Sequence, residues 1–246
     1  MSRDYARETE KRVAFLKKAL ENSGAKGFVY GNSGGKDSAL VGILCRMASE
    51  NTLGVVMPCS SARNYGEDRD DGLDVARQFD IATIEVDLTA VKEAELKAIS
   101  AVQEIADMAA GNIAPRLRMT TLYTIAQSRG CLVAGTGNRS EAYVGYFTKW
   151  GDGAYDINPI ADLTVGEIYE FLRYLNAPAN IISKAPSAGL FEGQTDEQEM
   201  GITYAALDHY ILTGEGPADM VDKIKAMHAR SAHKRASALV YKEDAE

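Results

Sequence analysis

The chain has few of the features that mark secreted, zinc-stabilised, membrane-spanning or nucleic-acid-binding proteins. It contains only three cysteines in 246 residues, and none forms a C-x-x-C pair. This usage argues against a disulfide framework or a zinc site and is typical of reduced thiols in the cytoplasm. No apolar run approaches the roughly 20 residues of a membrane span, and the N-terminus is too polar for a signal peptide. The formal net charge of −8 argues against a nucleic-acid backbone as the main partner, so we expect a cytoplasmic protein that binds neither nucleic acid nor membrane.

Short apolar runs alternate with helical stripes along the chain. Four of these runs, and a fifth short segment, are predicted to be strands: 27–30, 53–57, 81–86, 131–134 and 156–160. The helical patterns between and after them include 4–22, 37–47, 90–108, a helix from about 115, and a helix opened by the capping box at 164–167. This alternation predicts an α/β fold, a doubly wound parallel five-stranded sheet with helices on both faces. We expect residues 1–246 to form one domain, with ligands at the carboxyl ends of the strands.

The most informative segment is 31–38, which reads Gly-Asn-Ser-Gly-Gly-Lys-Asp-Ser and joins a strand to a helix. Such a turn stacks backbone N–H groups at the positive end of a helix, which favours phosphate. Ser33 and Ser38 add hydroxyl groups, and Asp37 adds a carboxylate able to hold Mg²⁺. The segment is not a Walker A loop, because Tyr30 stands where that motif needs its first glycine. A plain turn would need only the two glycines, and it would leave the Ser, Asp and Ser unexplained.

This segment resembles the Ser-Gly-Gly-x-Asp-Ser pyrophosphate loop (PP-loop) of the ATP pyrophosphatases, which cleave ATP between the α and β phosphates. A second block consists of Gly-Thr-Gly-Asn-Arg-Ser-Glu at 135–141 and Gly-Tyr-Phe-Thr-Lys-Trp-Gly-Asp-Gly-Ala-Tyr-Asp at 145–156. It resembles the Gly-Thr-x-x-x-x-Glu and Phe-Thr-Lys-Tyr-Gly-Asp-Gly-x-x-Asp stretches of the ammonia-dependent NAD synthetases. The first motif marks the superfamily and the second is specific to the family. The resemblance extends from residue 27 to about residue 235.

The resemblance implies an adenine nucleotide alpha hydrolase-like fold and a carbon–nitrogen ligase. In this family ATP adenylates the carboxylate of deamido-NAD with loss of pyrophosphate, and ammonia then displaces AMP to give NAD. Mg²⁺ is the implied cofactor and ATP the co-substrate. Because the chain has no room for a glutaminase domain, we expect free ammonia, or ammonia from a separate subunit, as the nitrogen donor. The family also implies a homodimer with deamido-NAD at the subunit boundary. The apolar stretch 117–125 would suit that boundary, and core packing would explain it equally well.

The resemblance also implies roles for individual residues. The implied ATP contacts are Gly31, Asn32, Ser33, Gly34, Gly35, Lys36, Asp37, Ser38, Met57, Thr136, Lys184 and Thr203. The implied deamido-NAD contacts are Asn112, Arg116, Lys149, Asp156, His233 and Lys234, with Arg118 and Tyr123 as weaker candidates. Asp37 and Glu141 are the implied magnesium ligands. Asp152 is our candidate for the carboxylate that accepts a proton from ammonia.

Each of these assignments has a simpler alternative. Glu141 could be a solvated helix residue, Thr136 could be only a helix cap, and His233 with Lys234 could be an ordinary basic helix end. Lys149 and Asp156 could be surface charges.

Two features depart from the family pattern. Lys36 occupies the variable place of the loop, which is usually Ile, Val or Gln, and its amine either adds phosphate affinity or points to solvent. The proline that follows the His-Lys-Arg segment in the family is absent here, where Ala236, Ser237 and Ala238 stand.

Two other functions remain open on the sequence. One is a different adenylating ligase with the same loop, although such enzymes often carry cysteine pairs or basic surfaces for tRNA. The other is a nucleotide-binding module without chemistry, against which a second carboxylate at Glu141 argues. We also expect loops 60–70 and 189–202 to be mobile without ligand.

Overall fold

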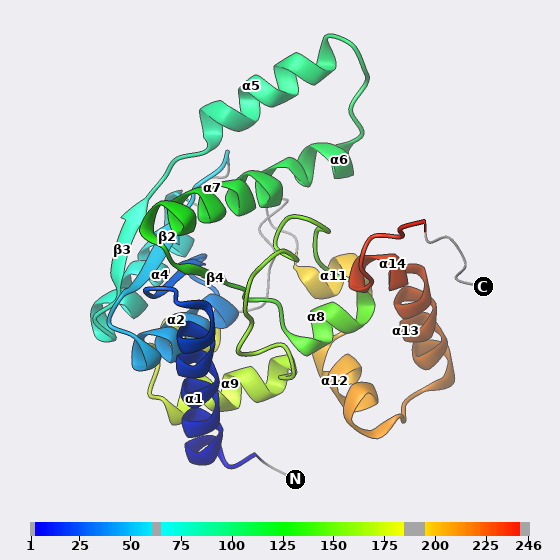
Figure 1. Ribbon diagram of the computed structural model, residues 1–246. Helices are drawn as coiled ribbons and strands as arrows, with labels where there is room; N and C mark the ends of the chain where they lie inside the picture. The colour runs from blue at the N-terminus through cyan, green and yellow to red at the C-terminus, as the bar shows by residue number, and fades with distance from the viewer. Residues whose placement is uncertain (1–2, 61–64, 185–194, 242–246) are drawn as a thin grey trace, which may run out of the picture.

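The computed structural model describes residues 3–60, 65–184 and 195–241. In this part of the chain, four parallel strands form one sheet in the order β3-β2-β1-β4. Their bounds are β1 Phe28–Gly31, β2 Thr52–Val56, β3 Ala82–Glu85 and β4 Leu132–Ala134. Successive strands are joined through helices (Figure 1), as parallel pairing requires. The predicted α/β class with a helix-covered parallel sheet is therefore confirmed.

The prediction of a fifth strand at 156–160 is wrong for the described structure. Only one isolated parallel bridge, between Ala134 and Ile157, extends the sheet beyond β4. The side chain of Asp156 accepts a hydrogen bond from the backbone N–H of Val133 at 2.8 Å, so this group does not serve a strand ladder. Pro159 lies three residues further on and has no N–H to offer. A ladder cannot propagate between these two points.

Alternate residues of β1 belong to two different cores, because successive side chains of a strand point to opposite faces. Phe28 and Tyr30 are buried with α1 Tyr5–Ser23, α2 Lys36–Ala48 and α9 Val165–Tyr174, and α4 Glu67–Gln78 and α10 Ala179–Ser183 join them on this face. Val29 is buried on the other face, against α7 Ile113–Arg129. The sheet is thus covered on both faces, which leaves the ends of its strands as the place for a ligand.

One helix prediction was wrong in its extent. The helical stripe predicted at 90–108 is divided into α5 Thr89–Ser100 and α6 Asp107–Gly111. No glycine or proline stands between them to mark the break. No residue of α5 is buried, so packing does not hold the helix beyond Ser100. Figure 1 shows α5 reaching away from the rest of the molecule.

A third apolar cluster lies beside the sheet. It is formed by α8 Arg139–Val144, α11 Asp196–Met200, α12 Tyr204–Thr213 and α13 Ala218–Arg230, together with Val165 and Tyr169 of α9. The short helix α14 Ala232–Arg235 follows α13 and has no buried residue. Among the described helices, none is both long and apolar enough to cross a membrane. The two loops predicted to be mobile, 60–70 and 189–202, lie partly outside the described residues, at 61–64 and 189–194.

Candidate active site

The sheet reverses its strand order at β1, since β2 pairs on one side of it and β4 on the other. The carboxyl ends of β1 and β4 therefore bound a crevice, the usual ligand position in such sheets. A cavity of about 760 Å³ opens there. Most of the residues predicted from the sequence to bind ligands line it: Gly31, Asn32, Ser33, Gly35, Lys36, Asp37, Ser38, Asn112, Thr136, Glu141, Lys184, Asp152, Met57, His233 and Lys234.

The loop between β1 and α2 is held in shape by its two serines. Ser33 Oγ donates to Ser38 Oγ at 3.1 Å, and Ser38 Oγ also accepts from the backbone N–H of Ser33 at 3.3 Å. Gly34 has φ of 71°, and a Cβ there would lie 1.9 Å from the backbone oxygen of Asp68. Glycine is thus required by both conformation and space. These contacts hold the loop at the N-terminus of α2, where the N–H groups of the first turn have no partner within the helix and favour an anion.

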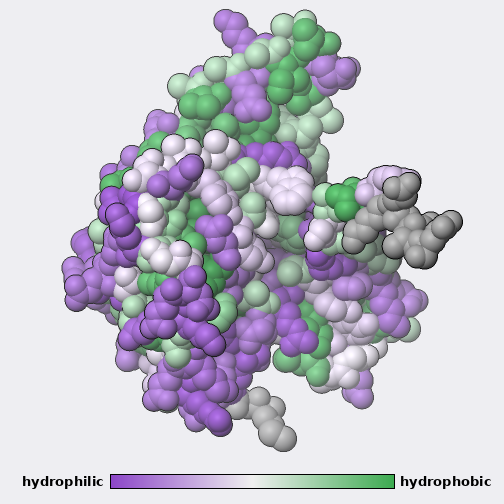
Figure 2. Space-filling model, viewed as in Figure 1, coloured by the Kyte–Doolittle hydropathy of each residue, from purple (hydrophilic) through white to green (hydrophobic). Residues whose placement is uncertain are grey.

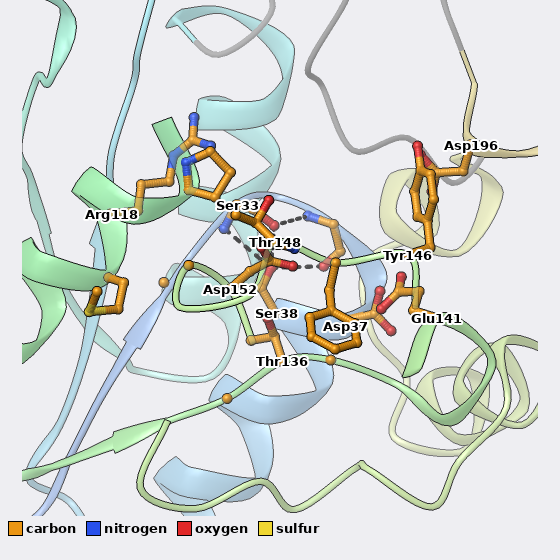
Figure 3. A pocket seen from close by; sticks show the side chains of 18 of the residues that line it. Ser33, Asp37, Ser38, Arg118, Thr136, Glu141, Tyr146, Thr148, Asp152 and Asp196 are labelled. Atoms are coloured by element: carbon orange, nitrogen blue, oxygen red, sulfur yellow. Dashed lines mark hydrogen bonds between the residues drawn. The ribbon is translucent and has the colours of Figure 1, made fainter. Parts of the chain in front are cut away.

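Asp37 and Glu141 lie in this cavity although 104 positions separate their sequence numbers. Asp37 is in the first turn of α2, and Glu141 in the first turn of α8. Asn138 connects them: its Nδ2 donates to Asp37 Oδ1 at 3.2 Å, while its Oδ1 accepts from the Glu141 N–H at 2.9 Å. Figure 3 shows the two carboxylates on adjacent elements. Burial, and then the negative charge of Asp37, raise the pKa of Glu141 to about 8.

Lys36 enters this carboxylate pair from the loop itself. Its side chain is only 6% exposed, and its Nζ donates to Asp37 Oδ2 at 2.7 Å. The ammonium also lies 5.7 Å from the centre of the Tyr204 ring. Burial would lower the pKa of Lys36, but the charges of Asp37 and Glu141 outweigh it and raise this pKa. Of the two alternatives left open by the sequence, the one in which the amine points to solvent is therefore wrong.

A second lysine, Lys184, sits at the opposite side of the loop. Its Nζ donates to Asp68 Oδ1 at 2.7 Å and to Asp71 Oδ2 at 2.5 Å, and it lies 3.4 Å from the carbonyl oxygen of Gly34. The two carboxylates come from α4, so Lys184 links that helix to the phosphate-type loop. Sequence reasoning missed Asp68 and Asp71, because nothing local to α4 shows that it packs against residues 34 and 184.

The far end of the cavity carries Asp152 between two cations. Asp152 Oδ1 accepts from the Thr148 N–H at 2.9 Å. The carboxylate is accessible from the cavity but crowded by protein, and this desolvation raises its pKa against the lowering effect of its hydrogen bonds and of Lys234 and Arg118. Lys234 Nζ donates to the carbonyls of Gly145 and Phe147 at 2.8 and 2.7 Å. Lys234 thus braces the 145–147 segment as well as facing the cavity.

Several residues assigned from the resemblance lie outside the cavity lining: Gly34, Arg116, Lys149, Asp156, Thr203 and Tyr123. Gly34 is packed beneath Asp68, as described above. Lys149 Nζ donates to the carbonyl of His233 at 2.6 Å, and Arg116 donates to the carbonyl of Lys149 at 3.3 Å. These two residues form an exposed chain beside the cavity mouth, and their ligand roles stay predictions.

Asp156 and Thr203 serve the backbone in this structure. Asp156 accepts from Val133 N and, at 3.2 Å, from the hydroxyl of Tyr123, and it borders a separate hollow of about 570 Å³. Thr203 is the N-cap of α12, where its hydroxyl accepts from the Ala206 N–H at 3.3 Å. Their assigned ligand contacts also stay predictions.

Asp196, which lines the cavity, and Asn138, which is buried behind Asp37 and Glu141, were not among the predicted site residues. Asp196 is buried and accepts from the hydroxyls of Tyr204 at 3.1 Å and Tyr146 at 3.3 Å. It lies in the C-terminal helices, where no motif points to it. Asn138 carried a usable signal, because Asn-x-x-Glu at 138–141 is a capping box that orients Glu141.

The donor set suits one kind of metal. Among the described residues, no group of three or more His, Cys, Asp or Glu side chains could hold a metal ion. Mg²⁺ needs no such cage, because it is commonly bound by one or two carboxylates together with substrate phosphates. Asp37 and Glu141, crowded enough to raise the pKa of one of them, fit that pattern.

Three comparisons with known proteins bear on this site. Residues 8–238 match the sequence model of a family described as NAD synthase. The chain is 48% identical over 235 residues to the NH(3)-dependent NAD(+) synthetase of Carboxydothermus hydrogenoformans, covering 94% of this chain and 96% of that one.

Two solved structures extend the comparison. The NMN synthetase of Francisella tularensis superposes with a TM-score of 0.93 at 36% identity, covering 98% of this chain and all of that one. An NH3-dependent NAD synthetase from Campylobacter jejuni, in complex with nitrate, superposes with a TM-score of 0.79 at 30% identity and the same coverage.

Proposed function

The chain belongs to the NAD synthase family, and from this premise we propose how its cavity forms NAD from deamido-NAD, ammonia and ATP. ATP adenylates the nicotinate carboxylate, pyrophosphate leaves, and ammonia displaces AMP. A carboxylate is a poor acyl donor, and adenylation gives it a leaving group. The protein must therefore seat a triphosphate, align a carboxylate with its α-phosphorus and admit ammonia.

The observation that carries this proposal is that the loop after β1 and the start of α8 meet in one cavity at the reversal point of the sheet. The loop brings the N–H groups of the α2 N-terminus, with Ser33 and Ser38, to bind phosphate oxygens. Thr136 and Glu141 line the same cavity. We propose that Lys184, which contacts Asp68, Asp71 and the carbonyl of Gly34, also contacts the outer phosphates.

Asp37 and Glu141 would hold Mg²⁺ in this site. The ion, when bound, neutralises charge that builds on the triphosphate as pyrophosphate leaves. The protein groups around it keep both carboxylates in place: Asn138 bonds to both residues, and Lys36 pairs with Asp37. We propose these roles because two crowded carboxylates beside a phosphate-type loop match the usual protein share of a magnesium–nucleotide site.

Asp152 would take the proton that ammonia loses when it attacks the adenylate. A carboxylate whose pKa is raised by crowding is a stronger proton acceptor than an exposed one. Lys234 and Arg118 flank it, and both could also attract the phosphate groups of a dinucleotide. Replacing Asp152 by Asn should slow ammonolysis of the adenylate while leaving its formation intact; an unchanged ammonolysis rate would remove Asp152 from this role.

The test of the function is a complete assay. The purified chain is incubated with ATP, Mg²⁺, ammonium and deamido-NAD, and AMP, pyrophosphate and NAD are quantified. Equal amounts of the three products are expected, formed far more slowly by Asp37→Asn. Nucleotide binding without any product would support a binding module, and AMP formation only with another acceptor would support a different adenylating ligase.

A second candidate substrate is favoured by one structural finding. The NMN synthetase of F. tularensis has the higher TM-score, 0.93 against 0.79 for the NAD synthetase of C. jejuni, at similar coverage. The same cavity would then amidate a mononucleotide that carries the nicotinate carboxylate. Competition between deamido-NAD and nicotinate mononucleotide in one reaction decides the question, because the ratio of NAD to NMN formed gives the ratio of kcat/KM.

We also propose that the chain works as a homodimer in the cytoplasm. α5 has no buried residue, and large apolar side chains are exposed on and after it: Val91 at 49%, Val102 at 84% and Met108 at 54%. Figure 2 shows apolar surface gathered over this projecting part. Such a helix suits contact with a second copy. Light scattering of the wild type should give twice the chain mass, and Val102→Glu should lower it toward one chain mass; a monomeric wild type would reject the dimer.

A further inference from the structure

Lys36 lies at a position where neither the helix dipole nor the phosphate-binding type of loop at residues 31–38 requires a cation. It is the first residue of α2, where the positive end of the helix dipole disfavours positive charge. A flexible lysine would normally extend to water from such a position. Instead, the side chain turns inward and is 6% exposed. Something in the site must compensate both the dipole and the burial.

The compensation comes from the carboxylates assigned to Mg²⁺. Lys36 Nζ is 2.7 Å from Asp37 Oδ2, and Asn138 Nδ2 donates to the other oxygen of Asp37. Glu141, when it is ionised, adds negative charge from α8, and the face of the Tyr204 ring lies under the ammonium. The lysine thus occupies part of the electrostatic position that a divalent cation would take.

We propose that Lys36 is a built-in cation that makes the Asp37–Glu141 pair select Mg²⁺ delivered together with the nucleotide over free Mg²⁺. The inference rests on the proposed function, since it assumes that these carboxylates hold the metal. Lys36 acts through Asp37 and Glu141, so it is a positioning residue.

The selectivity follows from charge balance. A free divalent cation meets a carboxylate that already has an ion-pair partner, and it is repelled by the nearby ammonium. A metal–triphosphate complex brings several negative oxygens, and these attract the same ammonium at the loop that binds phosphate. The ammonium therefore weakens the binding of free Mg²⁺ and strengthens the binding of Mg²⁺ that is bound to ATP.

The geometry also explains how the cluster holds together before ligand arrives. Two crowded carboxylates repel each other, and an ion pair with Asp37 relieves part of that repulsion. Replacing Lys36 by Gln, one of the residues usual at this place of the loop, removes the charge and preserves much of the volume. This variant is therefore expected to fold.

The experiment measures Mn²⁺ binding to chelator-stripped, full-length protein through the electron paramagnetic resonance signal of free Mn²⁺, first without nucleotide and then with saturating ATP. Without nucleotide, Lys36→Gln should bind Mn²⁺ at least about tenfold more tightly than the wild type. With ATP, this gain should disappear. Lys36→Arg should restore weak binding of the free ion, and Lys18→Gln, which removes a charge from the exposed side of α1, should match the wild type in both conditions.

A second readout is the unfolding temperature in chelator at pH 8, where Lys36→Gln should unfold at a lower temperature than the wild type. Equal or weaker binding of free Mn²⁺ by Lys36→Gln would overturn the inference, even if NAD synthesis is confirmed. If the wild type binds no Mn²⁺ with ATP present, the assignment of Asp37 and Glu141 to the metal fails, and the inference fails with it.

Discussion

Two clusters of charged side chains in this protein differ in how their charges are balanced. The N-terminal ion cluster consists of Arg3, Glu8, Arg12, Asp162 and Glu167. Arg12 is 8% exposed, and its guanidinium donates to Glu8 at 2.8 Å and to both oxygens of Asp162 at 2.6 and 2.9 Å. Arg3 binds Glu167 at 2.7 Å. Here two cations meet three anions in close, largely paired contacts.

The active-site carboxylate cluster consists of Lys36, Asp37, Glu141 and Asp196. Among the described residues of this cluster, one cation faces three anions. The pKa values show the consequence of the difference. Burial alone would raise the pKa values of Glu8 and Asp162, but Arg12 outweighs it and lowers both. Burial and Asp37 raise the pKa of Glu141 to about 8 despite Lys36.

The comparison teaches that these clusters have different tasks. The N-terminal ion cluster has its charges satisfied by the fold itself, so it ties α1 to the segment before α9. Among its described residues, the active-site carboxylate cluster carries more acidic than basic side chains. Such a site is expected to lower stability until a ligand arrives, and this is the usual relation between stability and function.

The largest effect is expected for a substitution in the active-site carboxylate cluster. Asp37→Asn should reduce NAD formation on the order of 10³-fold, because the site loses both a metal ligand and the partner of Lys36. The assay is the rate of NAD formation at saturating substrates, with circular dichroism to show that the variant is folded. A folded variant within a few-fold of wild-type activity would remove Asp37 from the mechanism.

The second largest effect is expected for a substitution in the N-terminal ion cluster. Arg12→Gln should lower the free energy of unfolding by about 3 kcal/mol, because it leaves Glu8 without its buried partner. Urea unfolding measures the change, and the matched control is Arg77→Gln, whose pair with Asp74 is exposed at 73% and 43%. That control should change stability by less than about 0.5 kcal/mol. Equal losses in both variants would show that burial does not distinguish these ion pairs.

The two clusters are expected to change the free energy of unfolding with pH in opposite directions. Glu8 and Asp162 have pKa values lowered by folding, so their stabilisation is present at neutral pH and is lost as pH falls below about 4. Glu141 has a raised pKa, so the folded state without metal binds its proton more tightly than the unfolded state. Its contribution to stability therefore falls as the pH rises from 4.5, the usual pKa of a Glu carboxyl, to about 8, the pKa of Glu141 in the folded state.

Urea unfolding in chelator between pH 3 and pH 9 measures both limbs. The slope from one group reaches at most about 1.4 kcal/mol per pH unit. Arg12→Gln should flatten the acid limb only, and Glu141→Gln the limb between pH 5 and pH 8 only. A variant that flattens the other limb would contradict the assignment of that limb.

The smallest effect lies within the N-terminal ion cluster. Arg3 is more exposed than Arg12, 26% against 9% for the side chains. Arg3→Gln should therefore cost only about 0.5–1 kcal/mol of unfolding free energy. The same urea experiment checks it, and a loss as large as that of Arg12→Gln would show that position in the network matters more than burial.

Much of the fold could be predicted because local pattern and tertiary structure agree. The alternating runs around 28–31, 52–56, 82–85 and 132–134 became strands, and the capping box at Thr164 and Glu167 opened α9. The prediction of a fifth strand was wrong because the side chain of Asp156 accepts the backbone N–H of Val133, which a strand ladder would need. The helix break after Ser100 was not predicted, because no local signal in the sequence marks it.

The candidate site was predictable to the extent that motifs follow strand ends. Asp37 and Glu141 were expected at one edge of the sheet, and both line the cavity there. Lys36 could not be oriented from sequence, because its burial beside Asp37 depends on the packing that brings Glu141 of α8 and Tyr204 of α12 to it. Asp68 and Asp71 could not be found at all, since only the packing of α4 brings them to Lys184.

One measurement tests most directly the claim that the active-site carboxylate cluster holds negative charge for a metal and nucleotide to balance. The unfolding free energies of the wild type and Glu141→Gln are compared at pH 8, in chelator and then with excess Mg²⁺ and ATP. Gln can still accept the hydrogen bond of the capping box at Asn138. We predict that Glu141→Gln is the more stable protein in chelator and the less stable one with Mg²⁺ and ATP. A variant less stable than the wild type in chelator would contradict the account.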